Sequence, residues 1–274
     1  HNVIESFQPT PPDRGEGPQA TFRSLSLQAQ FQREGFVVLD AFEPDEVASL
    51  RASFEDLYVG ETTDTCHRSN ESLDLGYRRA LHRLITGALD PIVRSELVDH
   101  RSFSSGTLVK WKGPNSAMPV HQDWTMVDET RYRAVSLWVP LCDVDQSNGA
   151  LAVLPGSHHV LHGMRPNPGT PPSVIDPLGG VSPIELQSVE MRAGQCLVFD
   201  HGVGHGSPPN SCDEPRIALV LAAAPATATL QHLWRRPDDL IDRFEVADAE
   251  FFRHCTPGYR PDHDGITLVE TLPF

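Results

Sequence analysis

Apolar side chains recur at helical spacing in the first part of this chain. Residues 24–34 predict a short helix that ends at Gly35 and leads into a β-rich run at 36–39. Residues 43–60 predict a longer helix, because acidic residues crowd the first turn and a glycine stands at the end. The apolar positions of this second helix lie three and four residues apart: Val47, Leu50, Phe54 and Leu57.

The pattern then becomes less regular before a further helical stretch. Residues 61–77 are polar and predict a loop. Residues 78–98 have helical periodicity, but Pro91 lies inside them. Since proline lacks the backbone N–H that a helix interior needs, we expect two helical pieces with a break before Pro91.

Beyond about residue 101 the apolar runs become short and β-rich, with turn residues between them. Residues 162–183 are rich in proline and glycine and predict a long loop of the kind that often covers a binding site. Residues 225–274 predict mixed helix and coil. The expected strands lie near 106–112, 133–139, 150–154, 184–191, 195–199 and 215–223.

Helices followed by many short strands indicate an α+β fold that is mainly β. We expect a jelly roll or β-sandwich, with the N-terminal helices as a buttress against it. Residues 1–22 predict a flexible arm, and residues 23–274 predict one domain with no internal repeat or linker. Its core covers about 100–224, and 225–274 form a C-terminal extension.

Composition narrows the class of partner. The 274 residues carry a net charge of −15, which argues against nucleic acid and anionic membranes as partners. No apolar run approaches the roughly 18 residues of a membrane span, and no signal peptide is evident. The five cysteines lack CxxC spacing and predict free thiols in a reducing compartment. We therefore expect a cytoplasmic monomer or homodimer that acts on a small molecule.

The stretch "VHQDWTMVDE" at 120–129 contains the first candidate chemistry. In an extended segment, residues two apart point the same way, so His121 and Asp123 can reach one metal ion. A third ligand comes from either His201 or His205. Two histidines and one carboxylate on one face of an iron are typical of non-heme Fe(II) oxygenases.

The neighbouring polar residues have simpler interpretations. Asp128 and Glu129 read as surface acids, whereas Trp124 could face a substrate. His158 and His159 lie in a turn and read as structural residues.

Several longer stretches resemble the phytanoyl-CoA dioxygenase family of Fe(II)/2-oxoglutarate oxygenases. They cover roughly 100–224, and the opening "FQREGFVVLDAF" at 31–42 fits as well. The resemblance implies a double-stranded β-helix fold and the cofactors Fe(II), 2-oxoglutarate and O2. The matching stretches are "HQD" at 121–123, "SLWVPLCDVDQSNGALAVLPGSH" at 136–158, "AGQCLVFD" at 193–200 and "HGSPPN" at 205–210.

The family's spacing selects the third ligand. Its distal histidine follows the strand phenylalanine by about six residues and precedes the co-substrate arginine by about eleven. His205 lies six after Phe199 and eleven before Arg216, whereas His201 lies two and fifteen away. The resemblance therefore implies His121, Asp123 and His205 as metal ligands, with His201 lining the pocket or supporting them.

The resemblance also implies the residues around 2-oxoglutarate. Arg216 matches the arginine that pairs with the far carboxylate, and a guanidinium suits that bidentate task. Ser207 matches a hydroxyl at the same carboxylate. Trp138, Gln122 and, more loosely, Lys110 match positions that line or contact the co-substrate.

The sequence contains less information about the residues that contact the substrate. Trp124, His201 and Arg235 are the candidates there, with the 61–77 loop, the 162–183 loop and the C-terminal arginines as possible walls. Related halogenases replace the acidic ligand by a small residue, so the presence of Asp123 indicates oxygenation instead. An acidic chain with only two lysines offers no basic patch for the phosphates of a CoA thioester.

The expected function is oxidation of an unactivated C–H bond of a small molecule, by hydroxylation, in natural-product or amino-acid metabolism. One alternative keeps the same cofactors but ends in epimerisation, cyclisation or desaturation. Another is a cupin-type metal protein that is non-catalytic or works without 2-oxoglutarate.

Overall fold

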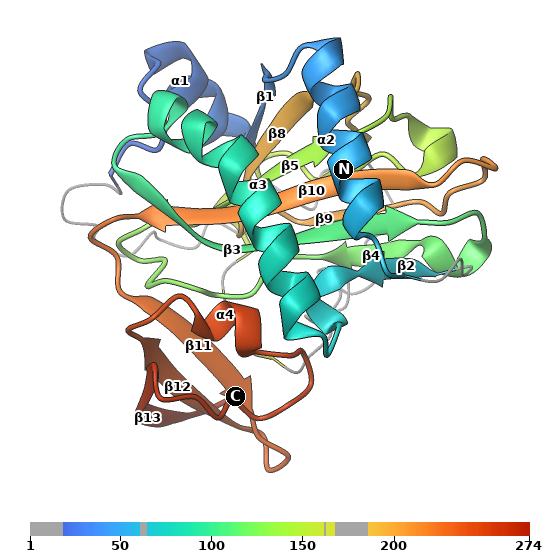
Figure 1. The fold of residues 1–274 in the computed structure, drawn as a ribbon. Coiled ribbons are helices and arrows are strands. Elements are labelled where there is room, and N and C mark those ends of the chain that lie inside the picture. The colour runs from blue at the N-terminus through green and yellow to red at the C-terminus, as the bar shows by residue number, and fades with distance from the viewer. Residues whose placement is uncertain (1–18, 61–64, 162, 168–185) are drawn as a thin grey trace, which may run out of the picture.

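Two antiparallel sheets form the centre of the molecule in the computed structural model, which describes residues 19–60, 65–161, 163–167 and 186–274 (Figure 1). The larger sheet has the order β1-β8-β5-β10-β3-β2, and the smaller one has the order β4-β9-β6-β7. The larger sheet contains β1 (Phe36–Asp40), β2 (Cys66–Arg68), β3 (His100–Lys110), β5 (Val135–Pro140), β8 (Gln195–Asp200) and β10 (Arg216–Pro225). The smaller sheet contains β4 (Met118–His121), β6 (Ala152–Val153), β7 (Gln187–Ser188) and β9 (His205–Ser207).

Three helices cover the larger sheet on one side (Figure 1). They are α1 (Leu25–Glu34), α2 (Pro44–Leu57) and α3 (Leu75–Glu96). Leu81 and Ile85 of α3 are fully buried in the same apolar cluster as Leu219 and Leu221 of β10. Burial of this surface is the main favourable term that holds helices on a sheet, and it leaves the other face of the sheet free for a site. The predicted helical buttress is therefore present in a fold that is mainly β and antiparallel.

Helix α3 corrects one prediction, because it runs without a break through Pro91. A proline in a helix interior removes one backbone hydrogen bond and costs up to about 3 kcal/mol. The apolar face continues on both sides of the proline, where Leu89 and Val93 are buried. Packing of this face against the sheet outweighs the local cost of the proline.

The C-terminal extension is a second correction, because it contains a third antiparallel sheet and one short helix. The sheet has the order β11-β12-β13 and consists of β11 (Leu230–Arg235), β12 (Leu240–Val246) and β13 (Ile266–Pro273). The helix is α4 (Phe251–His254). The segment was expected to be mixed helix and coil, but Arg243 pairs across the strands with Glu270. Opposite charges facing each other stabilise a sheet rather than interrupt it.

Other boundaries also differ from the predictions. The loop expected at 61–77 contains β2 and a 3₁₀ turn at Ser69–Glu71, and α3 already begins within it. The strands expected at 150–154 and 184–191 are only two residues long. Residues 1–18 of the expected arm and most of the 162–183 loop lie outside the described residues. Thr21 and Phe22, also assigned to the arm, are buried in the domain.

Among the residues that the structure describes, no helix has the length and apolar character needed to cross a membrane.

Candidate metal centre

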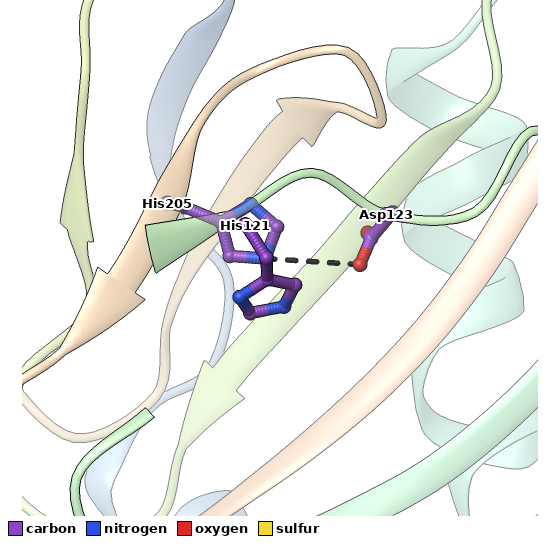
Figure 2. A group of neighbouring side chains, drawn as sticks. All are labelled: His121, Asp123 and His205. Carbon is purple, nitrogen blue, oxygen red and sulfur yellow. Dashed lines mark ion pairs between the residues drawn. The ribbon is translucent and has the colours of Figure 1, made fainter. Parts of the chain in front are cut away.

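Two strands of the smaller sheet bring three ligating side chains together. His121 ends β4, and its register partner in the antiparallel β4–β9 pair is His205, at the start of β9. Asp123 follows two residues after His121. One potential ligand atom from each of the three residues lies within 4.8 Å of the other two. His205 Nε2 and Asp123 Oδ1 are 3.7 Å apart, and the three side chains converge on one point (Figure 2).

Backbone carbonyls decide which nitrogen of each imidazole faces this point. His121 Nδ1 lies 2.8 Å from the carbonyl oxygen of Pro119, and His205 Nδ1 lies 2.9 Å from that of Val203. A carbonyl oxygen only accepts, so each Nδ1 carries the proton and each Nε2 keeps a free lone pair. This arrangement is common for metal-binding histidines, whose second nitrogen is held by an acceptor.

The protonation states also suit a cation. Burial, together with the neighbouring His205, lowers the pKa of His121 to about 4, so this ring is neutral at pH 7. Burial by itself raises the pKa of Asp123, but His205, His201 and His121 lower it to about 2. A neutral imidazole and a carboxylate are already in the form that binds a metal, because no proton has to leave first.

The three side chains open into a cavity of about 560 Å³ between the two sheets. Its walls include residues of β3, β5, β8 and β10 from the larger sheet and of β4 and β9 from the smaller one. Apart from the ligands, the candidate residues that line it are Arg216, Ser207, Trp138, Gln122, Trp124 and His201.

Arg216 supplies a buried positive charge to this cavity. It is 2% exposed, and its Nε and Nη1 atoms have no hydrogen-bond partner within the described part of the chain. The guanidinium carbon lies 5.3 Å from the centre of the Trp138 ring, at a distance that allows a cation–π contact. A buried guanidinium without a carboxylate partner is costly, so the position fits an anionic ligand.

Lys110 is fully buried but is not among the described residues that line the cavity. Its Nζ donates to the backbone carbonyls of Ser207, at 3.3 Å, and Pro208, at 2.6 Å. Burial and the nearby Arg216 lower its pKa to about 7. The structure therefore places Lys110 behind the end of β9, where it supports the strand that carries His205.

Gln122 and His201 lie beside the ligands and fix their surroundings. Gln122 Nε2 donates to the backbone carbonyls of Gly202, at 2.6 Å, and Leu161, at 3.2 Å. His201 Nε2 lies 3.1 Å from Ser136 Oγ and 3.8 Å from Asp123 Oδ2. These contacts tie the segment after β4 to the turn before β9.

Arg235 is a second candidate, after Lys110, that is absent from the described cavity lining. Its guanidinium forms an ion pair with Asp239 at 2.8 Å and lies 4.0 Å from the ring centre of Phe274. His159, read as structural, has its Nε2 2.6 Å from the carbonyl oxygen of Gln32, which accepts the bond.

Two features of the site had no clear signal in the sequence. Ser136 donates to Asp123 Oδ2 at 2.8 Å, and only its alternation with Trp138 along β5 hinted that it faces inward. Glu129 was read as a surface acid. Its side chain is only 23% exposed and forms an ion pair with the buried Arg165, so that prediction was wrong.

The family model for phytanoyl-CoA dioxygenase matches residues 31–218 of this sequence. The chain belongs to the phytanoyl-CoA dioxygenase family. The resemblance inferred from the motifs is therefore confirmed, and the protein is an iron- and 2-oxoglutarate-dependent oxygenase whose cofactors are Fe(II), 2-oxoglutarate and O2.

Two curated relatives are similar to this chain at the sequence level. An ectoine dioxygenase of Nocardia farcinica (strain IFM 10152) is 25% identical over 237 residues, which are 76% of this chain and 80% of that protein. A probable alpha-ketoglutarate-dependent hypophosphite dioxygenase of Stutzerimonas stutzeri is 28% identical over 149 residues. This second match spans 48% of this chain and only about half, 52%, of the relative's length.

Solved structures with a similar fold contain a metal ion, 2-oxoglutarate (alpha ketoglutarate) and a further small molecule. The epimerase SnoN, in complex with Fe3+, alpha ketoglutarate and nogalamycin RO, has a TM-score of 0.55 and 24% identity, over 89% of this chain and 95% of that one. HygX from Streptomyces hygroscopicus, with nickel, 2-oxoglutarate and hygromycin B, has a TM-score of 0.54 and 20% identity, over 74% and 88%. At this identity, the likeness establishes a shared fold.

Proposed function

We propose that this protein oxidises an unactivated C–H bond of a small molecule, with hydroxylation as the outcome. One observation carries the proposal: the three ligating side chains face the same cavity as Arg216, whose Nε and Nη1 have no hydrogen-bond partner among the described residues. We also propose that the two sheets around this cavity form a double-stranded β-helix. Antiparallel pairing throughout both sheets and the similar fold of SnoN support this part.

Each site residue has a role that follows from its position. His121, Asp123 and His205 would hold Fe(II) through Nε2, a carboxylate oxygen and Nε2. Iron held on one face by three protein ligands keeps positions open for 2-oxoglutarate and O2, and it supplies the oxidation chemistry. Arg216 and Ser207 would bind the far carboxylate of 2-oxoglutarate as charge-assisted and neutral donors.

The remaining candidates would shape the site. Trp138 forms a wall beside Arg216. Gln122 and Lys110 hold backbone around the site with side-chain donors that are already engaged, so positioning suits them better than direct contact with the co-substrate.

The substrate side of the cavity favours a small molecule without a large charge. Apart from Asp123 and Arg216, its charged lining among the described residues is Arg68 and Glu71, which pair with each other at 2.6 Å. A volume of about 560 Å³ must also contain 2-oxoglutarate. Trp124 and His201 would contact this substrate, which we place in natural-product or amino-acid metabolism. The names of the ectoine dioxygenase and of the hygromycin B complex support that class.

A second outcome with the same cofactors is epimerisation, and it is favoured by the likeness to the epimerase SnoN. Cyclisation and desaturation would need the same residues and differ only in where the substrate lies. A cupin-type metal protein without 2-oxoglutarate is the weaker alternative, because it has no use for the buried guanidinium of Arg216.

The proposal is tested by turnover of the co-substrate. Purified protein with Fe(II) and ascorbate should convert 2-oxoglutarate to succinate slowly, even without its substrate. His121→Ala and Asp123→Ala should abolish this conversion, whereas His159→Ala, outside the cavity lining, should retain it. Near-normal succinate release from either ligand variant would refute the proposed centre.

The 2-oxoglutarate anchor has a separate test, which distinguishes this class from a metal protein without a co-substrate. Calorimetric titration of the Ni(II)-loaded protein should show about 10- to 100-fold weaker 2-oxoglutarate binding for Arg216→Gln, since a charged hydrogen-bonded pair contributes roughly 1.5–3 kcal/mol. Arg68→Gln lines the same cavity and is the matched control, with affinity close to wild type. Equal affinities for the two variants would exclude Arg216 as the anchor.

A further inference from the structure

The segment that carries Asp123 has no regular structure of its own. Strand β4 ends at His121 and β5 begins at Val135, and the residues between them belong to no helix or strand. The position of Asp123 therefore depends on tertiary contacts. Its N–H donates to the carbonyl oxygen of His201 at 3.1 Å, and its carboxylate accepts from Ser136 Oγ at 2.8 Å.

The backbone carbonyl of Asp123 is held by a third residue, Arg165. Arg165 Nε donates to this oxygen at 2.5 Å. Its Nη1 donates to Glu129 Oε2 at 3.0 Å, and its Nη2 donates to the other oxygen of the same carboxylate. One guanidinium thus bridges the metal ligand and an acid six residues further along the segment.

The backbone of Arg165 adds two contacts to the same segment. Its N–H donates to Thr125 Oγ1 at 3.1 Å, and its carbonyl accepts from the Thr125 N–H at 3.2 Å. Arg165 is only 3% exposed, so the residues from Asp123 to Glu129 fold around it. Side-chain and backbone atoms of Arg165 thus hold the first part of this irregular segment.

Burial makes the two partners depend on each other. A guanidinium that is 3% exposed needs a paired carboxylate, because an unpaired buried charge is strongly unfavourable. Without Glu129, the side chain of Arg165 would gain by turning toward water, and Nε would leave the Asp123 carbonyl. The Asp123 peptide could then rotate, and its Cα–Cβ bond would no longer point at the two histidines.

We propose that Arg165 and Glu129 form a positioning pair that holds Asp123 in its metal-binding orientation. Neither side chain belongs to the described cavity lining, so neither would touch metal, co-substrate or substrate. The pair acts only through the backbone of a ligand. This inference rests on the proposed metal centre and goes beyond it, since the residue matches with the family do not include this pair.

The chain offers a matched control for this pair. Arg253 and Glu250 form another half-buried ion pair, in and beside α4, with side chains 18% and 28% exposed. They lie in the C-terminal extension, outside the described cavity lining. A variant here should affect stability in a similar way without reaching Asp123.

The test measures metal affinity directly, because a merely structural role would change stability alone. Metal-free wild type, Glu129→Gln, Arg165→Lys and Glu250→Gln would be titrated with Co(II), following visible absorption and heat well below each melting temperature. We expect about 10- to 100-fold weaker Co(II) binding and an altered Co(II) spectrum for the first two variants, a typical effect of groups that orient metal ligands. Glu250→Gln should bind Co(II) as wild type does.

A double variant sharpens the test. If Glu129 acts through Arg165, the double variant should bind Co(II) less than twofold more weakly than Arg165→Lys alone. Glu129→Gln is nearly isosteric, so it keeps the proposal testable even if Arg165→Lys does not fold. Co(II) affinity of folded Glu129→Gln within twofold of wild type would overturn the positioning role alone. Failure of wild type to bind Co(II) or Fe(II) would overturn the proposed centre as well.

Discussion

Lys110 is a cationic side chain that lies inside the protein, away from water. It is fully buried and pairs across β3 and β10 with Arg216, so two cationic residues are neighbours inside the protein. Burial is the main cause that lowers the pKa of its ammonium group, and Arg216 adds to it. Two backbone carbonyls, of Ser207 and Pro208, accept from Nζ and compensate part of this cost.

This environment predicts a pH dependence of stability. The folded-state pKa of Lys110 is about 7, against 10.5 for an ordinary lysine. Between pH 7 and pH 10.5, the Lys110 amine is protonated in the unfolded chain and mostly neutral in the folded protein. The free energy of unfolding therefore rises with pH, by up to roughly 1 kcal/mol per pH unit. Urea denaturation at pH 7 and pH 9.5 should show this rise in wild type relative to Lys110→Met.

Lys112 is the natural control for this prediction. It is exposed and paired with Asp213, and that contact raises its pKa. It stays protonated in both states across the same interval, so Lys112→Met should follow the pH profile of wild type. A profile for Lys110→Met parallel to wild type would show that Lys110 keeps an ordinary pKa in the folded protein.

At the scale of the element, two helical glycines have opposite roles. Gly87 lies inside α3, and beyond the local helix backbone and its two chain neighbours a Cβ atom there would meet no described atom within 4 Å. Gly35 caps the end of α1 with φ +82°, and a Cβ there would lie 2.3 Å from a methyl carbon of Val203. The first glycine only adds flexibility, whereas the second closes the helix where β1 begins.

The same substitution should therefore change stability in opposite directions. Gly87→Ala should raise the free energy of unfolding by about 0.5–1 kcal/mol, because alanine is the better helix former. Gly35→Ala should lower it by more than about 1 kcal/mol, because the residue is left-handed and the space is filled. Urea denaturation checks both. A loss of stability for Gly87→Ala would contradict the open surroundings of that position.

At the scale of the whole molecule, the C-terminal extension completes the cavity. Pro257 and Gly258, just after α4, line it together with residues of the two central sheets. Arg78 of α3 joins this extension to the rest of the protein. Its Nη2 donates to the carbonyl oxygens of Phe252, at 3.0 Å, and Cys255, at 2.8 Å.

Arg78 should therefore be needed to hold the extension in place. Arg78→Met should lower the free energy of unfolding by about 2–4 kcal/mol, because two carbonyls lose a charged donor inside the protein. Limited proteolysis should then cut the 225–274 segment faster than in wild type. Arg83→Met, at an exposed position of the same helix, is the control. Equal stability of the two variants would mean that other contacts hold the extension.

The sequence by itself determined the features that are written in local spacing. The two-residue step from His121 to Asp123, the helical repeat of α2 and the family motifs up to Arg216 all lie within short windows. Such patterns report backbone geometry directly, because strands and helices repeat every 2 and 3.6 residues. They were sufficient for the family, the class of fold and the candidate ligands.

Only the tertiary structure decided features that depend on burial and on distant partners. It showed that Pro91 does not break α3, that charged strands form the C-terminal sheet, and that Lys110 lies behind the cavity. It also paired Glu129 with Arg165, which local spacing marked as a surface acid and a loop residue. The energy of a charge or a proline depends on what surrounds it after folding, and a short stretch of sequence does not contain that information.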